Sequence, residues 1–305
     1  MPPHLPSSLA IITGSGQGLG KHFAAKLLSE GAKVCISDIK VETGQRVVEE
    51  FGAKFGEENV LFLPCDVTKV EDLVSLYEGC ENHFNQRVNI FCNNAGINHA
   101  PGWRRCIEID SMAVVAGTEV VLDRMGVQAG GQGGLIVNTA SLAGILKGFN
   151  RESVSYYVAK HGVVSLTRSL GQDYLCKRTG VQHVAICPAF AATDIIEDLG
   201  VNKETLELKE GIMEPEYVAD CFLKLVKSGE NGDVMVVRKS CPPFIYKDYS
   251  LPLVGALSVG GRVMRSLGVL PGGVFTVKHQ TALLVAAVLI VEIVIGLIAY
   301  LVLTI

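Results

Sequence analysis

Tyr156 and Lys160 stand four positions apart in the sequence and could together perform acid–base chemistry. On a helix this spacing brings both side chains to one face. A tyrosine with its ordinary pKa of about 10 is a poor base at neutral pH, but a neighbouring ammonium stabilises the phenolate and lowers that pKa. The pair therefore predicts a tyrosine base that is assisted by a lysine.

Ser141 is a third residue with chemical potential, because it follows an apolar run at residues 135–138 that predicts a strand. A hydroxyl at the carboxyl end of such a strand can hydrogen-bond a substrate oxygen. The alternative is a serine that caps a turn.

A glycine-rich turn at residues 13–20, with the sequence TGSGQGLG, joins the first predicted strand to the first predicted helix. Glycines let the backbone approach a pyrophosphate, which then lies at the positive end of the helix. Asp38 follows the second predicted strand, where a carboxylate can accept hydrogen bonds from a ribose 2'-hydroxyl and repels a 2'-phosphate. The pattern predicts a dinucleotide site that prefers NAD to NADP, although Lys40 lies close by.

Apolar runs that predict strands alternate with amphipathic stretches that predict helices along most of the chain. Strands are expected at residues 9–13, 33–37, 60–63, 88–91, 135–138, 181–187 and 234–237. Helices are expected at residues 19–29, 41–55, 70–84, 107–125, 158–174 and 215–227. This alternation is typical of βαβ units and predicts an α/β fold, a single doubly wound Rossmann-type domain with a parallel sheet. Ligands bind such sheets at the carboxyl ends of the strands.

The composition excludes two broad classes of protein. Of 305 residues, 49% are hydrophobic and 19% are charged, which is incompatible with a disordered chain. The net charge of -4 argues against a nucleic-acid surface. Nine cysteines are spread singly without a CxxC pair, so we expect reduced thiols in a domain that faces the cytoplasm, and no metal site.

Residues 282–303 form an apolar segment with a single charge, Glu292, and its length matches the thickness of a bilayer. Basic residues precede the segment and none follows it, so the large domain is expected in the cytoplasm. The sequence predicts a catalytic domain at residues 1–247, a linker at 248–280 and a transmembrane tail anchor at 281–305. The endoplasmic reticulum is favoured over the mitochondrial outer membrane.

The sequence resembles the short-chain dehydrogenase/reductase family over residues 9–238, because five motifs of that family occur in order. They are the glycine-rich turn, Asp66-Val67 after the third strand, NNAG at residues 93–96, Ser141, and Tyr156-x-x-x-Lys160. Within the family, the chain is most similar to the dehydrogenases that act on 15-hydroxyprostaglandins. That similarity lies in CDVT at residues 65–68, SLAG at 141–144, KHG at 160–162 and ICP at 186–188.

The resemblance implies a role for each residue of the site. Tyr156 would remove the hydroxyl proton, Ser141 would position the alcohol, and Lys160 would hold the nicotinamide ribose. The residues implied to bind the cofactor are Gly14, Gln17, Gly18, Leu19, Gly20, Asp38, Ile39, Cys65, Asp66, Val67, Asn94, Tyr156, Lys160, Ala191 and Thr193. Those implied to bind the substrate are Ser141, Ser153 and Tyr156. Residues 190–213 would cover the substrate as a flap, and the helices at 107–125 and 158–174 would pair subunits in a homodimer.

The sequence departs from the family pattern at several positions. Asp110 stands where the family usually has an asparagine of its proton relay, and Ala189 replaces the glycine that commonly follows Pro188. Ser153 replaces the substrate-contacting glutamine of the prostaglandin dehydrogenases. These differences bear on the substrate more than on the reaction.

We expect NAD-dependent oxidation of a secondary alcohol on a lipophilic substrate to the ketone, with a 15-hydroxyprostaglandin or a related hydroxy fatty acid as substrate. One alternative is a steroid or retinoid dehydrogenase. The other is a membrane-anchored dinucleotide-binding protein without turnover, to which Asp110 and Ala189 point.

Overall fold

A computed structural model of the chain describes residues 3–98, 102–148, 151, 153–193 and 211–247. The chain divides into two units, Met1–Tyr246 and Lys247–Ile305. The predicted linker at 248–280 and the predicted tail anchor at 281–305 lie outside the described residues. Among the helices of the described ranges, none has the length and apolar character needed to cross a bilayer.

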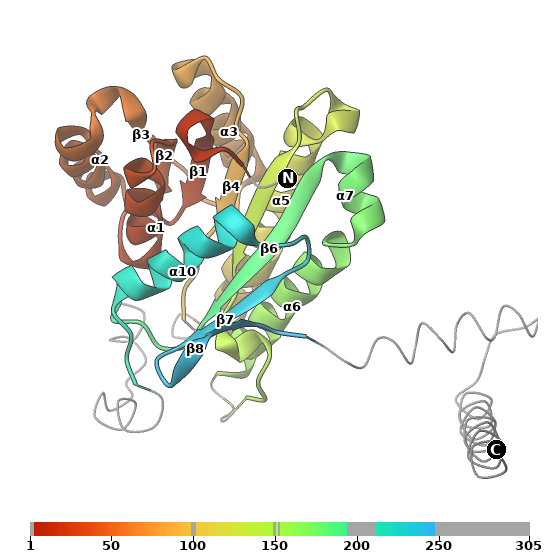
Figure 1. Ribbon diagram of the computed structural model, residues 1–305. Helices are drawn as coiled ribbons and strands as arrows, with labels where there is room; N and C mark the ends of the chain where they lie inside the picture. The colour runs from red at the N-terminus through yellow and green to blue at the C-terminus, as the bar shows by residue number, and fades with distance from the viewer. Residues whose placement is uncertain (1–2, 99–101, 149–150, 152, 194–210, 248–305) are drawn as a thin grey trace, which may run out of the picture. The chain divides into compact units, whose positions relative to one another are not determined.

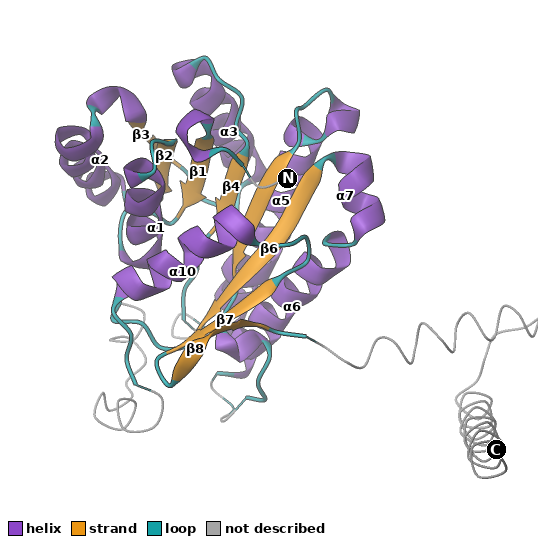
Figure 2. Ribbon diagram, in the orientation of Figure 1, coloured by secondary structure: helices purple, strands orange, loops and turns teal. Residues whose placement is uncertain are grey.

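Eight strands form one sheet in the order β3-β2-β1-β4-β5-β6-β7-β8, drawn in orange in Figure 2. The first seven strands run parallel, and β8 is antiparallel to β7. All residues of β1 are buried, as expected of a strand covered on both faces. The strands are β1 (Leu9–Thr13), β2 (Lys33–Asp38), β3 (Val60–Pro64), β4 (Ile90–Asn93), β5 (Gly134–Thr139), β6 (Val181–Pro188), β7 (Val234–Arg238) and β8 (Cys241–Ile245).

Helices cover both faces of the sheet (Figure 1). One face carries α1 (Gly18–Ser29), α2 (Val41–Phe55) and α10 (Pro215–Ser228). The other carries α3 (Val70–Phe84), α5 (Ala113–Met125) and α6 (Val154–Leu170). Shorter pieces are α4 (Trp103–Ile107), α7 (Asp173–Thr179), the 3-10 turns η1 (Leu5–Ser7), η2 (Glu57–Asn59), η4 (Val127–Ala129) and η5 (Leu142–Gly144), and a π-helical turn, η3 (Glu108–Met112). The predicted doubly wound α/β fold is confirmed for this domain.

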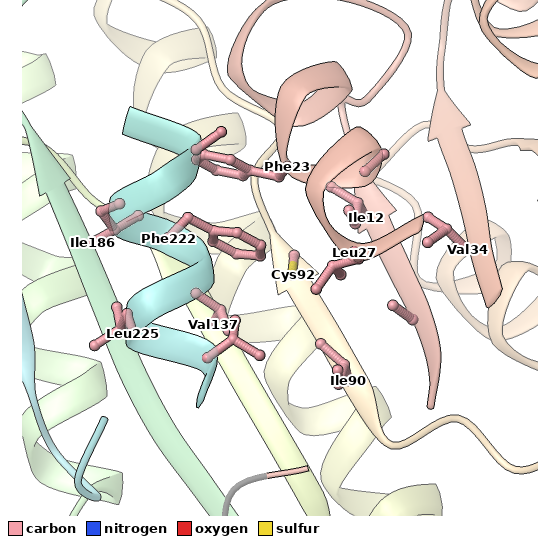
Figure 3. Packing of buried hydrophobic residues seen from close by; sticks show 14 of the residues in the cluster. Ile12, Phe23, Leu27, Val34, Ile90, Cys92, Val137, Ile186, Phe222 and Leu225 are labelled. Carbon is pink, nitrogen blue, oxygen red and sulfur yellow. The ribbon is translucent and has the colours of Figure 1, made fainter. Parts of the chain in front are cut away.

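The contact between α1 and α10 closes one face of the sheet. Phe23 of α1 and Phe222 of α10 stack with ring centroids 4.1 Å apart and rings nearly parallel. Both belong to a buried cluster that includes Ile12, Val137 and Ile186 of the sheet (Figure 3). This packing fixes the position of α1, which begins in the glycine-rich turn.

Most of the predicted elements lie where the structure has them, but three bounds are wrong. The strand predicted at 88–91 is β4, Ile90–Asn93, because the Val88 backbone N–H donates to Glu81 Oε1 at 2.9 Å. The helix predicted at 158–174 begins at Val154 and ends at Leu170, where the following Gly171 approaches Gly232. The helix predicted at 107–125 begins earlier, in α4, and contains the π-helical turn η3.

The sequence did not predict strand β8, which contains Pro242 and Pro243. Proline has no N–H to donate and is therefore confined to sheet edges. β8 is the edge strand of this sheet, and Val236 of β7 pairs with its Phe244. The two prolines therefore explain why the sequence pattern did not predict β8.

His183 of β6 is a buried titratable group away from the glycine-rich turn and the tyrosine. Its side chain is 2% exposed, and its Nδ1 makes no hydrogen bond within the described part of the chain. Burial lowers the pKa of His183 to about 4. The neutral imidazole is therefore the form that the folded protein retains.

His183 predicts a loss of stability in acid. Because its pKa is lower in the folded than in the unfolded state, its contribution is intact above about pH 6.5 and is lost as the pH falls towards 4. Between pH 7 and pH 5 this amounts to about 2 kcal/mol. Urea unfolding at the two pH values should show that His183→Gln reduces this loss. His4→Gln, which changes an exposed histidine, should leave the loss unchanged; equal losses in both variants would contradict the assignment.

Candidate active site

The residues that the sequence predicted as functional gather at one end of the sheet. Each follows the carboxyl end of one of strands β1 to β6 or lies at the start of α6. Residues 14–20 follow β1, Asp38 and Ile39 end or follow β2, and residues 65–67 follow β3. Asn94 follows β4, Ser141 follows β5, and Ala191 and Thr193 follow β6. Ser153, Tyr156 and Lys160 lie before or within the first two turns of α6.

The turn between β1 and α1 has a backbone that requires glycine. Gly14 and Gly18 have φ values of 62° and 56°, in the left-handed region. A Cβ on Gly14 would lie 2.6 Å from the Cα of Ala95, so the loop after β4 packs directly on the turn. Gly18 faces Thr193, whose Cγ2 would lie 3.7 Å from an added Cβ.

The start of α1 fits a bound pyrophosphate. Gln17 is the N-cap residue, but its side chain makes no capping hydrogen bond to the helix. Its Oε1 instead accepts a hydrogen bond from Lys40 Nζ at 3.2 Å. The N–H groups of Gly18, Leu19 and Gly20 have no acceptor inside the helix, and they are suited to phosphate oxygens. The residues present therefore fit the phosphate portion of NAD.

The Asp38 carboxylate is held in place by two backbone groups. The N–H of Gly16 donates to its Oδ2 and the N–H of Lys40 donates to its Oδ1, each at 3.0 Å. The carboxylate is thus fixed beside the glycine turn, where the sequence predicted a ribose contact. Ile39 follows with a side chain that is 59% exposed, so it offers an apolar surface beside that position.

Three residues that were predicted to bind the cofactor, Cys65, Asp66 and Val67, lie in the loop after β3. The N–H and hydroxyl of Thr68 donate to Asp66 Oδ1 at 3.1 and 2.7 Å, and these hydrogen bonds lower the pKa of Asp66. The Cys65 side chain is buried, and its backbone N–H donates to the Asp38 carbonyl. Val67 is half-buried and packs on the cluster beneath α3 and α5. Asp66 is therefore the polar group that this loop presents.

Asn94 ties three strands together at the centre of the site. Its Nδ2 donates to the carbonyls of Thr13 and Gly14 at 2.9 and 3.0 Å, and its Oδ1 accepts from Thr139 Oγ1 at 3.2 Å. The hydroxyl of Thr13 also accepts from the N–H groups of Asn94 and Ala95. Neither Thr13 nor Thr139 was among the predicted site residues, although Thr13 ends one predicted strand and Thr139 directly follows another.

Tyr156 lies beside both of its expected partners. Lys160 Nζ lies 5.6 Å from the centroid of its ring, and the Ser141 hydroxyl lies close enough to the phenol to lower its pKa. Ser141 also accepts a hydrogen bond from the N–H of Ala143 at 3.1 Å, so the turn-capping alternative describes part of its role. The structure thus brings Ser141, Tyr156 and Lys160 together from two separate elements.

Burial and the neighbouring groups shift the pKa values of Tyr156 and Lys160 in opposite directions. Burial is the largest influence on the pKa of Tyr156 and raises it. The Lys160 ammonium and the Ser141 hydroxyl lower this pKa but do not offset burial, so the net shift is upward and not the predicted lowering. Burial is the largest influence on Lys160 and opposes its charge, but Asp110 and Tyr156 together offset burial and the pKa of Lys160 is raised. Lys160 therefore stays an ammonium beside the phenol.

Asp110 lies inside the π-helical turn η3 and reaches Lys160. Its Oδ2 lies 3.0 Å from Lys160 Nζ, and its Oδ1 accepts from the Ile97 N–H at 2.8 Å. π-helical turns occur often at functional sites, because they redirect side chains within a helix. The fourth-helix position that departs from the family pattern is thus in direct contact with the catalytic lysine candidate.

A buried polar network beneath the site was also missed from sequence. Asn93 Nδ2 donates to Asn138 Oδ1 at 2.9 Å and to Thr118 Oγ1 at 3.2 Å. Asn138 Nδ2 in turn donates to Thr167 Oγ1 at 2.9 Å. These bonds join β4 and β5 to α5 and α6. In the sequence, Asn93 is the first residue of the NNAG motif and Asn138 ends a predicted strand, and neither feature indicates this network.

The segment predicted as a flap is anchored where it leaves and rejoins the domain. The Met213 N–H donates to the Phe190 carbonyl, and the Ala192 N–H donates to the Met213 carbonyl, each at 2.9 Å. Thr193 Oγ1 donates to the Ala191 carbonyl at 3.3 Å. Residues 194–210 of the predicted flap lie outside the described residues.

Comparisons with known proteins agree with this geometry. The short chain dehydrogenase family matches residues 8–204. The chain is 33% identical to 15-hydroxyprostaglandin dehydrogenase [NAD(+)] of Homo sapiens over 250 residues, 78% of this chain and 93% of that protein. It is 33% identical to cyclohexanol dehydrogenase of an Acinetobacter strain over 202 residues, 63% of this chain and 76% of that protein.

The fold is also similar to a solved structure that contains the reduced cofactor. A 3-ketoacyl-(acyl-carrier-protein) reductase from Brucella melitensis, complexed with NADH, superposes with a TM-score of 0.66 at 26% identity. The superposition covers 76% of this chain and 96% of that one. Together with the fitting glycine turn, these similarities establish NAD as the cofactor.

The fixed carboxylate of Asp38 predicts the choice of cofactor. Asp38→Asn removes the charge that repels a 2'-phosphate, so the ratio of the Kd for NADP to that for NAD should fall about tenfold or more. Equilibrium binding monitored by protein fluorescence measures both constants without any substrate. Glu42→Gln removes an exposed charge at the start of α2 and should leave the ratio unchanged. An unchanged ratio in Asp38→Asn would count against the ribose contact.

Proposed function

Because this chain belongs to the short-chain dehydrogenase family and is an NAD-dependent alcohol dehydrogenase, we propose that it oxidises a secondary alcohol on a lipophilic molecule to the ketone. The proposed substrate is a 15-hydroxyprostaglandin or a related hydroxy fatty acid. The observation that carries the proposal is the position of Tyr156, which lies close to both the Ser141 hydroxyl and the Lys160 ammonium.

The side chains divide the work of removing two hydrogens from the alcohol. Ser141 hydrogen-bonds the substrate oxygen and orients the carbinol carbon. Tyr156, as the phenolate, accepts the hydroxyl proton, and the Lys160 ammonium stabilises that phenolate. Bound NAD supplies the acceptor for the hydride that leaves the same carbon. The products are a ketone, NADH and a proton.

Support for the substrate class comes from the extent of the similarity to the human enzyme. That similarity spans 93% of the prostaglandin dehydrogenase and so extends beyond the cofactor-binding half of the fold. Ser153, directly before α6, replaces the glutamine of the prostaglandin enzymes, so the contacts to the substrate differ in detail. A hydroxylated fatty acid other than a prostaglandin is compatible with this difference.

Tyr156→Phe tests the reaction. NADH formation should fall at least about a hundredfold, because a phenyl ring accepts no proton, while the Kd for NAD changes little. The measurement is NADH absorbance with a panel of prostaglandin, hydroxy-fatty-acid, steroid and retinoid alcohols. The matched control is Tyr174→Phe on α7, where the ring is exposed.

Three outcomes of the panel are informative. Turnover of a prostaglandin or hydroxy fatty acid that disappears in Tyr156→Phe would support the proposal. Selective turnover of a steroid or retinoid would replace the substrate class. Turnover that survives in Tyr156→Phe would contradict the role of the tyrosine.

We further propose that residues 281–305 anchor the protein in a membrane with the catalytic domain in the cytoplasm, the endoplasmic reticulum being favoured. The proposal rests on the apolar sequence at 282–303 alone. An anchor would hold the site close to the phase in which lipophilic alcohols concentrate.

Removal of the tail tests the anchor. The full-length protein should stay in the membrane pellet after carbonate extraction, and the variant without residues 281–305 should move to the supernatant. Full-length protein in the supernatant would contradict the proposal.

A homodimer through α5 and α6 stays a prediction. Its support in the structure is a group of exposed apolar side chains on these helices and on η3, namely Met112, Val115, Val154 and Val158.

A further inference from the structure

A buried ion pair lies beside the tyrosine of the site. Lys160 Nζ and Asp110 Oδ2 are 3.0 Å apart, and the two side chains are 5% and 1% exposed. The partners come from different elements, α6 and the π-helical turn η3. Removal of either partner would leave a buried charge without its counter-charge, which is costly. The pair therefore couples the position of Lys160 to that of Asp110.

Neighbouring groups hold the side chains of Asp110 and Lys160 in the positions in which they pair. The Ile97 N–H donates to Asp110 Oδ1 at 2.8 Å, and Lys160 Nζ donates to the Thr139 carbonyl at 3.2 Å. A Cβ on Gly96 would lie 3.2 Å from Asp110 Oδ2 and 3.4 Å from Lys160 Nζ, so the loop after β4 closes over both groups. Neither side chain can turn away without losing a hydrogen bond.

The charged groups that face Tyr156 are Lys160 from α6 and Asp110 from η3. The thiol of Cys106 on α4 and the hydroxyl of Ser141 after β5 also face it. Burial raises the pKa of Cys106, so this thiol stays uncharged. The thiol of Cys187 on β6, which lies near Lys160, has its pKa raised by burial to about 12 and is uncharged too. Asp110 is thus the negative charge that opposes a phenolate at Tyr156.

We propose that Asp110 is a positioning residue of the dehydrogenase site, which fixes the Lys160 ammonium and offsets part of the positive charge that stabilises the Tyr156 phenolate. This inference rests on the proposed function, in which Tyr156 is the base. An asparagine at the same position could accept the Ile97 N–H through its amide oxygen, but it carries no charge. The carboxylate therefore makes this site work at a higher pH than the same site with an amide.

Asp110→Asn tests the inference, because it keeps the shape of the side chain and removes its charge. The pKa of Tyr156 should fall, since the phenolate no longer faces a carboxylate, and that of Lys160 should fall with the loss of its partner. The pH profile of kcat/KM for alcohol oxidation should then move to lower pH by about one unit. Asp110→Glu, which keeps the charge, should keep a profile closer to that of the unchanged protein.

A second measurement needs no substrate. The ultraviolet absorbance of tyrosinate in the NAD-bound protein, taken as the difference between each protein and its Tyr156→Phe counterpart, reports the ionisation of Tyr156. This titration should move to lower pH in Asp110→Asn by about one unit. Asp220→Asn is the matched control, because it removes a carboxylate that pairs with Lys26 on the surface between α10 and α1. It should leave the titration in place.

The two measurements separate this inference from the proposed function. A Tyr156 titration that stays in place or moves to higher pH in Asp110→Asn overturns the inference, whether or not a substrate is known. A titration that shifts as expected, in proteins that turn over none of the alcohols, supports the ion-pair role and counts against the proposed substrates. If Asp110→Asn does not fold, Asp110→Ser provides the same test, because it also removes the carboxylate charge and keeps a polar side chain.

Discussion

The buried ammonium of Lys160 is the group around which the carboxyl end of the sheet is arranged. Lys160 Nζ is held by the Asp110 carboxylate at 3.0 Å and by the Thr139 carbonyl at 3.2 Å. These contacts require α6 to pack beside the end of β5, and the π-helical turn places Asp110 opposite the lysine. The hydrogen bonds of Asn93 and Asn138 hold the same strands and helices together one layer below. These contacts fix the helix that carries Tyr156 relative to the sheet.

Local patterns were sufficient to predict the fold because six of the eight strands of the sheet, β1, β2, β4, β5, β6 and β7, are almost wholly buried. β1 and the helices α2 and α3 have the bounds that the hydrophobic patterns predicted. Prediction failed where a non-local contact overrides the pattern. β8 is a strand only because β7 offers it a partner despite two prolines, and the start of β4 is set by the Glu81 side chain.

The sequence predicted which residue types form the site, but it predicted fewer of the hydrogen bonds and ion pairs between them. The glycine turn, Asp38 and the Tyr156–Lys160 pair each carry a spacing that indicates their chemistry. Thr139 and Asn138 carry no such spacing, because their roles depend on which strands lie next to each other. The sequence marked Asp110 as a departure from the family pattern, but its contact with Lys160 depends on the π-helical turn, which no periodicity revealed.

The pairing of Phe190 and Ala192 with Met213 fixes both ends of the segment that lies between them in the sequence. Once both ends of a segment are pinned, lengthening it costs little, about 0.6 kcal/mol for each doubling of its length. Insertions and substitutions between these ends therefore leave the sheet and the reacting groups undisturbed. Under the proposed function, the substrate preference can therefore change with this one stretch of chain while Ser141, Tyr156 and Lys160 stay in place.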